Sequence, residues 1–390
     1  MIAPTSFFLD YGCHVRILEE ARTLQKLGHR IKIVTYPLGR NVPGLDIERT
    51  LPIPFRSHRE VGPSRSKLVI DPLLALKSLQ LALTFRPHII HAHLHEAALI
   101  GGVLGRLLRV PLVFDFQGSM TSEMLDHRFI APHSKIVPLA QSLESRIDHL
   151  PQAILTSSQN AARLLTQDFR VPASKITLVS DCVNAEAFGP VEDGGRALAA
   201  RALQERLGIP QGRRIVIYIG LLDRYRGTDI LLEAASQVLA RRAETHFVII
   251  GFPNVDRYQA RAKELGIAER VSFVGRVPYE EVPLWLSLGD VAVEPKMSAT
   301  EAAGKVLNYM AMGLSVVAFD IPVMREYLGD LGVYAPLGDA SALADQIQAL
   351  LDHPEQAREI GCAMRERARH LYSWDCAGQA IEQVYRQVRH

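Results

Sequence analysis

The chain has 390 residues, more than one ordinary hydrophobic core needs, which suggests two domains. It is 48% hydrophobic and 22% charged, as expected for a soluble globular protein, and its net charge of +2 without aromatic-basic interleaving argues against nucleic-acid binding. The four cysteines form no CxxC pair, so neither a disulfide framework nor a cysteine metal site is expected, as in a reducing compartment. No transmembrane run or secretory signal is recognisable, and we expect a cytoplasmic protein.

Apolar strand-like runs alternate with helical patterns along the first half of the chain, which predicts βα units and a parallel sheet. The helical stretches VRILEEARTLQKLG and LIGGVLGRLLRV have apolar residues at spacings of three and four. A polar passage rich in glycine and alanine, NAEAFGPVEDGGRALAA, then predicts a linker. Strands are expected in IAP near the start and at 30–36, 88–93, 111–117, 153–158 and 175–181.

The second half repeats the alternation after the linker, and the last forty residues look helical. Here strands are expected at 213–220, 245–251, 270–275, 290–295 and 314–319. The pattern as a whole predicts the α/β class, with two doubly wound, Rossmann-like domains and a ligand cleft between them.

The stretch EAAGKVLNYMAMGLSVVAFD predicts a short helix that ends at Gly313 before a buried parallel strand. Lys305, Asn308 and Met312 share one face by helical spacing, opposite an apolar face. A polar face at a helix start beside a parallel sheet is suited to an anionic ligand. An ion pair between Glu301 and Lys305 is the alternative, but Gly304 favours binding because glycine allows the backbone to approach a ligand.

The stretch IYIGLLDRYRGTDILLEA predicts a second place for an anion. Gly220 ends a strand, Arg224 and Arg226 lie in the loop, and a helix begins after Gly227. Two guanidinium groups beside a helix start could clamp a diphosphate, and a solvent-exposed basic loop is the alternative. In the first half, Gly12 before a helix is a weaker indication of the same kind.

Two strand ends of the first half have polar side chains. HAHLHEA places His91, His93 and His95 on one side of an extended chain, but no carboxylate or cysteine cluster is adjacent in the sequence, so metal is the minor interpretation. We expect His95 to lie near the cleft instead. In FDFQGSM, Gln117 follows a strand and could bind sugar hydroxyls or merely cap the next helix.

In this order the segments resemble the retaining glycosyltransferases of family four, which have the GT-B fold. The resemblance covers essentially the whole chain. It implies transfer of a sugar from a nucleoside-diphosphate donor with retention, typically without metal. It also implies three regions with distinct roles. These are an acceptor-binding domain at 1–185, a donor-binding domain at 186–372, and a helix at 373–390 that crosses back to the first domain.

The resemblance also assigns residues by position. Arg226 stands where the family has a lysine on the donor diphosphate, and Leu221 replaces an arginine whose contact is lost or taken by Arg224. Of the family's two glutamate positions, one is Thr300, with Glu301 one place away, and the other is Asn308. The implied catalytic residues are Gln117, in place of a histidine, and Glu301. Donor binding falls to Arg224, Arg226, Thr300, Gly304, Lys305 and Asn308, and the acceptor or phosphate loop to Gly12 and His95.

The implied co-substrate is a UDP-sugar or GDP-mannose, and no cofactor is expected. The acceptor would be a hydroxyl of a lipid, saccharide or small molecule, in the cytoplasm or at the inner face of the membrane. Two alternatives stay open. One is a GT-B nucleotide-sugar epimerase, which needs an acid/base pair. The other is a non-catalytic nucleotide-sugar-binding protein, which the departures at Leu221, Asn308 and Gln117 favour.

Overall fold

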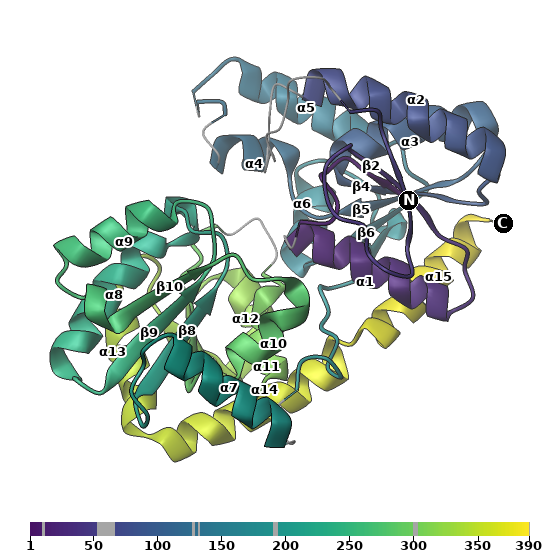
Figure 1. The fold of residues 1–390 in the computed structure, drawn as a ribbon. Coiled ribbons are helices and arrows are strands. Elements are labelled where there is room, and N and C mark those ends of the chain that lie inside the picture. Colours follow the sequence, from purple (N-terminus) through teal and green to yellow (C-terminus); the bar gives the residue numbers. More distant parts are fainter. Residues whose placement is uncertain are drawn as a thin grey trace. The chain divides into compact units, whose positions relative to one another are not determined.

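The computed structural model describes residues 1–9, 12–52, 67–126, 129–131, 133–189, 194–298 and 303–389. These residues form two compact units, each built around one parallel sheet (Figure 1). The first unit contains the chain up to Asp181 together with the C-terminal helix that begins at Trp374, and the second unit contains the described residues from Cys182 to Ser373.

The first unit has a seven-stranded sheet in the order β3-β2-β1-β4-β5-β6-β7. The strand order reverses at β1, so the sheet is doubly wound, and such sheets bind ligands at the carboxyl ends of their strands. Its strands are β1 (Ile2–Ala3), β2 (Lys32–Thr35), β3 (Asp46–Arg49), β4 (Ile90–His93), β5 (Leu112–Phe116), β6 (Ala153–Thr156) and β7 (Ile176–Leu178).

Helices cover the sheet of the first unit, and the last helix of the chain is one of them (Figure 1). Helix α3 contacts both α2 and α5, while α15 packs on α1 and reaches β6. Ile381 and Val384 of α15 are buried there, because the apolar stripe of this helix needs a covering surface. The helices are α1 (Gly12–Lys26), α2 (Lys67–Phe85), α3 (Leu94–Leu108), α4 (Met120–Asp126), α5 (Ile136–Asp148), α6 (Gln159–Gln167) and α15 (Trp374–Val388).

The second unit has a six-stranded parallel sheet in the order β10-β9-β8-β11-β12-β13. Its strands are β8 (Arg214–Ile219), β9 (Thr245–Ile250), β10 (Val271–Gly275), β11 (Val291–Glu294), β12 (Ser315–Phe319) and β13 (Val333–Ala335). Its helices are α7 (Gly194–Arg206), α8 (Thr228–Arg241), α9 (Val255–Glu264), α10 (Val282–Leu286), α11 (Lys305–Ala311), α12 (Pro322–Leu328), α13 (Ala340–Asp352) and α14 (Pro354–Leu371).

Three elements differ from the sequence-based prediction. Strands β3 and β13 were not predicted, because both are short edge strands without a continuous apolar run. Helix α7 begins at Gly194, inside the stretch predicted to be a linker. Its alanines, leucines and arginines favour a helix, and α7 packs on α10 with Leu203 buried, so tertiary burial stabilises what composition alone presented as a linker.

Candidate active site

Lys305 is held in one position at the carboxyl end of the second sheet. Its Nζ lies 3.0 Å from Oε2 of Glu294, the fully buried last residue of β11, and donates to the hydroxyl of Tyr218 over 3.2 Å. The ammonium also lies 4.4 Å from the centre of the Tyr218 ring, a cation–π contact. The pKa of Lys305 is lowered, because burial and the nearby charge of Arg226 together outweigh the opposite effect of Glu294. The side chain remains 19% exposed, so this positioned cation is accessible to a ligand.

Two glycines allow the loop between β8 and α8 to approach this cation closely. A Cβ on Gly220 would collide with the Nζ of Lys305 and the hydroxyl of Tyr218. Gly227 has a φ of +78°, and a Cβ there would meet the carbonyl of Pro295, the residue after β11. The backbone at Gly220 therefore packs against side chains and that at Gly227 against the backbone after β11, and larger residues at either position would push these parts away.

Arg226 lies on the same side of the site as Lys305, whereas Arg224 is on the surface. Both belong to a single 3-10 turn, Arg224–Arg226, directly before α8. Arg226 is half-buried with its guanidinium 4.9 Å from the centre of the Tyr225 ring, and its charge acts on the pKa of Lys305. The structure thus brings together Arg226 and Lys305, two of the predicted donor-binding residues.

Of the other predicted donor-binding residues, some lie at helix α11 and others fall outside the described residues. Asn308 is half-buried three residues after Lys305, on the same face of α11, and Gly304 directly precedes this helix. Thr300 and Glu301 lie outside the described residues. The prediction that Met312 shares the polar face is wrong. Helix α11 ends at Ala311, and the Met312 side chain packs in the core, only 5% exposed.

Sequence reasoning missed three residues of this region. Glu294 anchors Lys305, Tyr218 contacts it, and Lys296 is fully buried two residues after β11. Charged residues are almost never fully buried unless they are paired. The signal available in the sequence was the acidic and basic pair that interrupts the apolar run DVAVEPK.

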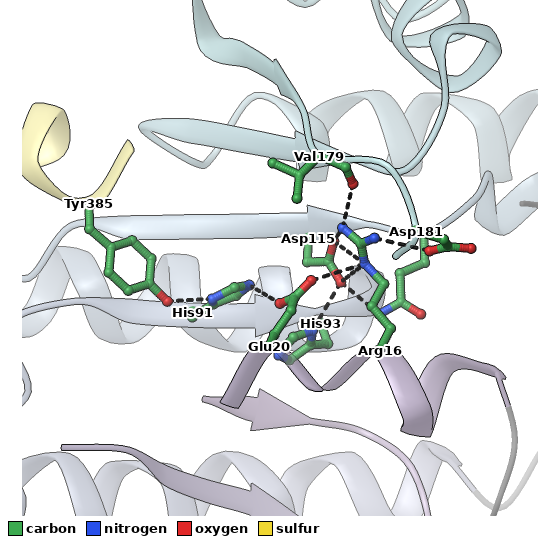
Figure 2. Close-up of polar contacts among 9 residues, drawn as sticks. Arg16, Glu20, His91, His93, Asp115, Val179, Asp181 and Tyr385 are labelled. Atoms are coloured by element: carbon green, nitrogen blue, oxygen red, sulfur yellow. Dashed lines mark hydrogen bonds and ion pairs between the residues drawn. The ribbon is translucent and has the colours of Figure 1, made fainter. Parts of the chain in front are cut away.

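A buried polar network lies at the carboxyl end of the first sheet, around Asp115 (Figure 2). The Nε of Arg16 donates to Oδ1 of Asp115 over 3.0 Å, and the Nη2 of Arg16 donates to the same oxygen over 2.8 Å. Gln117, the predicted catalytic residue, donates from its Nε2 to Oδ2 of Asp115 over 2.7 Å. Burial alone would raise the pKa of Asp115, but Arg16 and a hydrogen bond with His93 hold it well below its usual value. Asp115 is therefore an ionised anchor for Gln117.

His91 and His93 belong to this network and not to a strand end open to solvent. The Nδ1 of His93 lies 3.1 Å from Oδ2 of Asp115, and the Nδ1 of His91 lies 2.6 Å from the hydroxyl of Tyr385 (Figure 2). Glu20, which the sequence did not reveal as a neighbour, lies 3.5 Å from Nε2 of His91. Burial lowers the pKa of both histidines and raises that of Glu20.

Glu20, His91 and His93 have ligand atoms within 4.8 Å of one another, the composition of a possible metal site. The two imidazole rings, however, are stacked with centres 4.5 Å apart and planes at 19°. A nitrogen lone pair lies in the plane of its ring, so two nearly parallel rings cannot both point at one ion unless they rotate. We therefore interpret this group as part of the buried polar network, in which the Nδ1 atoms of the two histidines make the hydrogen bonds and Glu20 forms an ion pair with Arg16 over 3.0 Å.

His95, which the sequence predicted near the cleft, is buried within the first unit. Leu94 has a φ of +66°, so strand alternation stops there and His95 lies in the first turn of α3. Its ring is 4% exposed, with Nε2 3.3 Å from Oδ1 of Asp148 and 3.5 Å from Oε1 of Glu144. These three residues also have a composition suited to metal, but an ion pair with a charged His95 accounts for them. Burial lowers the pKa of His95, and Asp148 and Glu144 more than offset this, so that the pKa is raised.

Gly12 is the first residue of α1, and a Cβ there would meet no atom within 4 Å. Space alone does not require glycine at this position.

Two family profiles match the chain, one over each unit. Residues 12–187 match the family described as Glycosyltransferase Family 4, and residues 200–367 match Glycosyl transferases group 1. A D-inositol 3-phosphate glycosyltransferase from Thermobispora bispora is 25% identical over 96% of this chain and 89% of its own length. A phosphatidyl-myo-inositol mannosyltransferase from Mycobacterium leprae is 24% identical over 100% of this chain and 96% of its own length.

Solved structures of similar fold cover almost the whole chain. Sucrose-phosphate synthase from Thermosynechococcus elongatus superposes with a TM-score of 0.80 at 20% identity, over 99% of this chain and 98% of that one. HepE from Anabaena, in complex with UDP-glucose, has a TM-score of 0.79 at 15% identity over 99% and 98% of the two chains. These likenesses concern the fold.

Proposed function

The chain belongs to family four of the glycosyltransferases and has the GT-B fold, and from that premise we propose that it transfers a sugar from a nucleoside-diphosphate donor to a hydroxyl acceptor with retention. The observation that supports this most directly is the fixed ammonium of Lys305. It is held by Glu294 and Tyr218 at the carboxyl ends of β11 and β8, where two glycines allow the loop after β8 to approach closely.

The donor diphosphate is the ligand that this site suits best. Negative charge develops on the leaving nucleoside diphosphate as the glycosidic bond breaks, and cations already in place stabilise that charge without reorganisation. Lys305 and Arg226 supply the two cations, and the start of α8 lies directly after Arg226. Asn308 takes the ribose, and a UDP-sugar is the first donor to test, because HepE was solved with UDP-glucose; GDP-mannose is the second.

Gln117 binds the transferred sugar by accepting a hydrogen bond from one of the sugar hydroxyls. Glu301 is the second catalytic residue. Retention does not require a carboxylate nucleophile in this scheme. The donor phosphate itself helps to deprotonate the acceptor hydroxyl, which attacks from the face that the diphosphate leaves. The acceptor is a hydroxyl compound, and the first two to test are those in the names of the relatives, D-inositol 3-phosphate and phosphatidyl-myo-inositol.

The proposal is tested by incubating the protein with a panel of UDP- and GDP-sugars, with and without inositol phosphates, while free nucleoside diphosphate is measured. Slow donor hydrolysis that accelerates with an acceptor, and a product with the donor's anomeric configuration, are expected. An epimerised nucleotide sugar, or tight binding without turnover, would replace the proposal with one of the two alternatives.

We expect activity to persist in the presence of EDTA, because the proposed diphosphate contacts are side-chain cations and not a bridging ion. Donor turnover would be measured in EDTA, then after addition of Mg²⁺, Mn²⁺ or Zn²⁺. Loss of activity in EDTA that one of these ions restores would contradict this expectation. The histidine-carboxylate groups around His93 and His95 would then be the candidate metal sites.

We also propose that the acceptor is reached at a membrane surface, because the outer faces of α2, α3 and α5 are unusually apolar. Nine large apolar side chains on these adjacent helices are exposed, by 44% to 70%. Soluble proteins rarely expose large apolar side chains gathered on one face without a partner. We call this set the apolar face. It consists of Val69, Leu76, Leu83, Leu99, Val103, Leu107, Ile136, Leu139 and Leu143.

The charges around the apolar face favour anionic lipid over a second copy of the chain. Among the described residues of α2, α3 and α5, the exposed charged side chains are Arg106 and Arg146, and the exposed Arg86, Arg109 and Lys135 border these helices. A basic rim attracts anionic headgroups, whereas two such rims facing each other would repel. None of the described helices is long and apolar enough to cross a membrane. The proposal is therefore peripheral attachment.

Sedimentation with vesicles tests this attachment. The double variant Leu76→Glu/Leu139→Glu should bind vesicles containing an anionic lipid several-fold more weakly than the unchanged protein, because two charges must then enter the interface. The matched control is Leu198→Glu, at a side chain 72% exposed on α7 of the second unit. Equal binding of the double variant and the control would contradict the assignment.

A further inference from the structure

The buried carboxylate of Asp115 has more partners than a structural ion pair requires. Arg16 donates to it from Nε and from one terminal nitrogen, His93 lies at 3.1 Å, and Gln117 donates over 2.7 Å. Asp115 and His93 are fully buried and Arg16 is 4% exposed, whereas Gln117 is half-buried at the strand end. The network thus joins a buried interior to the half-buried side chain of Gln117 at the end of β5.

The contact with Asp115 determines which group Gln117 can offer to a ligand. An ionised carboxylate only accepts hydrogen bonds, so the amide of Gln117 must turn its NH₂ group toward Asp115. Its carbonyl oxygen has no hydrogen bond within the described part of the chain. Gln117 therefore presents an acceptor, and that orientation depends on Asp115 staying ionised.

Arg16 makes two further contacts at the place where the chain leaves the first unit. One terminal nitrogen donates to the carbonyl of Val179 over 3.0 Å, and the other to Oδ1 of Asp181 over 3.0 Å. Asp181 is the last residue of the first unit before Cys182 begins the second. One guanidinium therefore holds both the anchor of Gln117 and the start of the connecting segment.

We propose that Arg16 and Asp115 are positioning residues that act through Gln117, fixing its carbonyl oxygen as the acceptor for a hydroxyl of the transferred sugar. This rests on the proposed function for the role of Gln117, but the orientation of the amide does not. A buried charged pair without this task is replaceable by apolar residues at little cost. Here Asp115 sets the polarity of the group that meets the substrate.

A double-mutant cycle on turnover tests whether the two residues act through Gln117. Asp115→Asn allows the amide of Gln117 to reverse, and we expect kcat to fall at least ten-fold, as in Gln117→Ala, with little change in donor KM. In the Gln117→Ala background, Asp115→Asn or Arg16→Lys should cause no further fall. A full, additive loss in both backgrounds would mean a merely structural role and would overturn the proposal.

The matched control is Asp290→Asn in the second unit. Asp290 pairs with Arg214 over 2.9 Å and accepts a hydrogen bond from the backbone N–H of Ile215 over 2.7 Å, so the same substitution breaks an arginine–aspartate pair in the second unit, there partly exposed. It should lower the melting temperature without changing kcat.

A second readout does not require activity. The side-chain amide resonance of Gln117, identified by its disappearance in Gln117→Ala, should move in Asp115→Asn and Arg16→Lys and not in Asp290→Asn. An unmoved resonance in Asp115→Asn would overturn the positioning role even if the protein transfers sugar. A moved resonance in a protein that cleaves no donor would support the orientation and refute the proposed function instead.

Discussion

Replacing Lys305 with alanine should lower donor affinity and turnover together by roughly ten- to hundred-fold, since a hydrogen bond to a charged group is worth about 1.5–3 kcal/mol. The side chain is positioned by Glu294 and Tyr218, so a ligand gains the contact without ordering a flexible lysine. Calorimetric titration with UDP and kcat/KM for the preferred donor would measure the loss. Unchanged constants in a folded protein would contradict the diphosphate role.

The substitution also leaves the buried carboxylate of Glu294 without its partner, and a loss of stability must be separated from a loss of binding. The double variant Lys305→Ala/Glu294→Gln removes the stranded charge. We expect it to recover most of the melting temperature and none of the donor affinity. If donor affinity returned with stability, the effect of Lys305→Ala would be structural.

Glu294→Gln alone should change the pH dependence of donor binding. Burial lowers the pKa of Lys305, and Glu294 is the main group that raises it again. Removing Glu294 therefore lowers the pKa of Lys305 further, and the ammonium is lost at a lower pH. The alkaline limb of the pH profile should move toward neutrality in Glu294→Gln, whereas an unchanged limb would indicate that Lys305 does not titrate with binding.

Deleting α15 should unfold the first unit rather than only weaken its function. Ile381, Val384 and Tyr385 are almost fully buried, and each such side chain contributes about 1.5–3 kcal/mol. That sum approaches the whole stability of a domain, about 5–15 kcal/mol. The deletion would also expose His91, whose Nδ1 lies 2.6 Å from the Tyr385 hydroxyl. Limited proteolysis should then cleave the first unit rapidly while the second stays resistant.

Single substitutions in α15 test its contribution to the stability of the first unit by an effect small enough to measure. Ile381→Ala should cost about 2–5 kcal/mol of unfolding free energy, because it leaves a cavity against α1. Arg386→Ala, on the exposed side of the same helix and paired with Glu382, should cost less than about 1 kcal/mol. Equal effects in denaturant unfolding would show that α15 is not part of the stability of the first unit.

The short helix α11 illustrates how far local pattern reaches. Its apolar face, its end before Gly313 and the buried strand after it follow from residue spacing and are present in the structure. Spacing also put Met312 on the polar face, where the structure buries it, because the helix ends one residue earlier and Met312 packs in the core. Residue spacing could not reveal the partner of Lys305, because Lys305 begins helix α11 and Glu294 ends strand β11.

The histidines of the first unit show the same limit. Alternation correctly placed His91 and His93 on one side of a strand, but Leu94 adopts a left-handed φ, so His95 turns into a helix and pairs with α5. The acidic neighbours Glu20, Asp115, Glu144 and Asp148 come from other elements. A short sequence window contains no information about them.

The sequence by itself determined the α/β class, most of the strands, the helix starts beside the second sheet and the family, because each depends on residues close together in the chain. Only the tertiary structure decided that Glu294 anchors Lys305, that Asp115 orients Gln117 and that Arg16 reaches Asp181. In sequence, Arg16 lies 99 residues from Asp115 and 165 residues from Asp181. Gln117 follows Asp115 by only two residues, but its orientation depends on the ionised state that Arg16 and His93 give Asp115. These groups meet at the carboxyl ends of parallel strands. Packing brings them there, and in a buried site the need to pair every charge then fixes which atoms face the ligand.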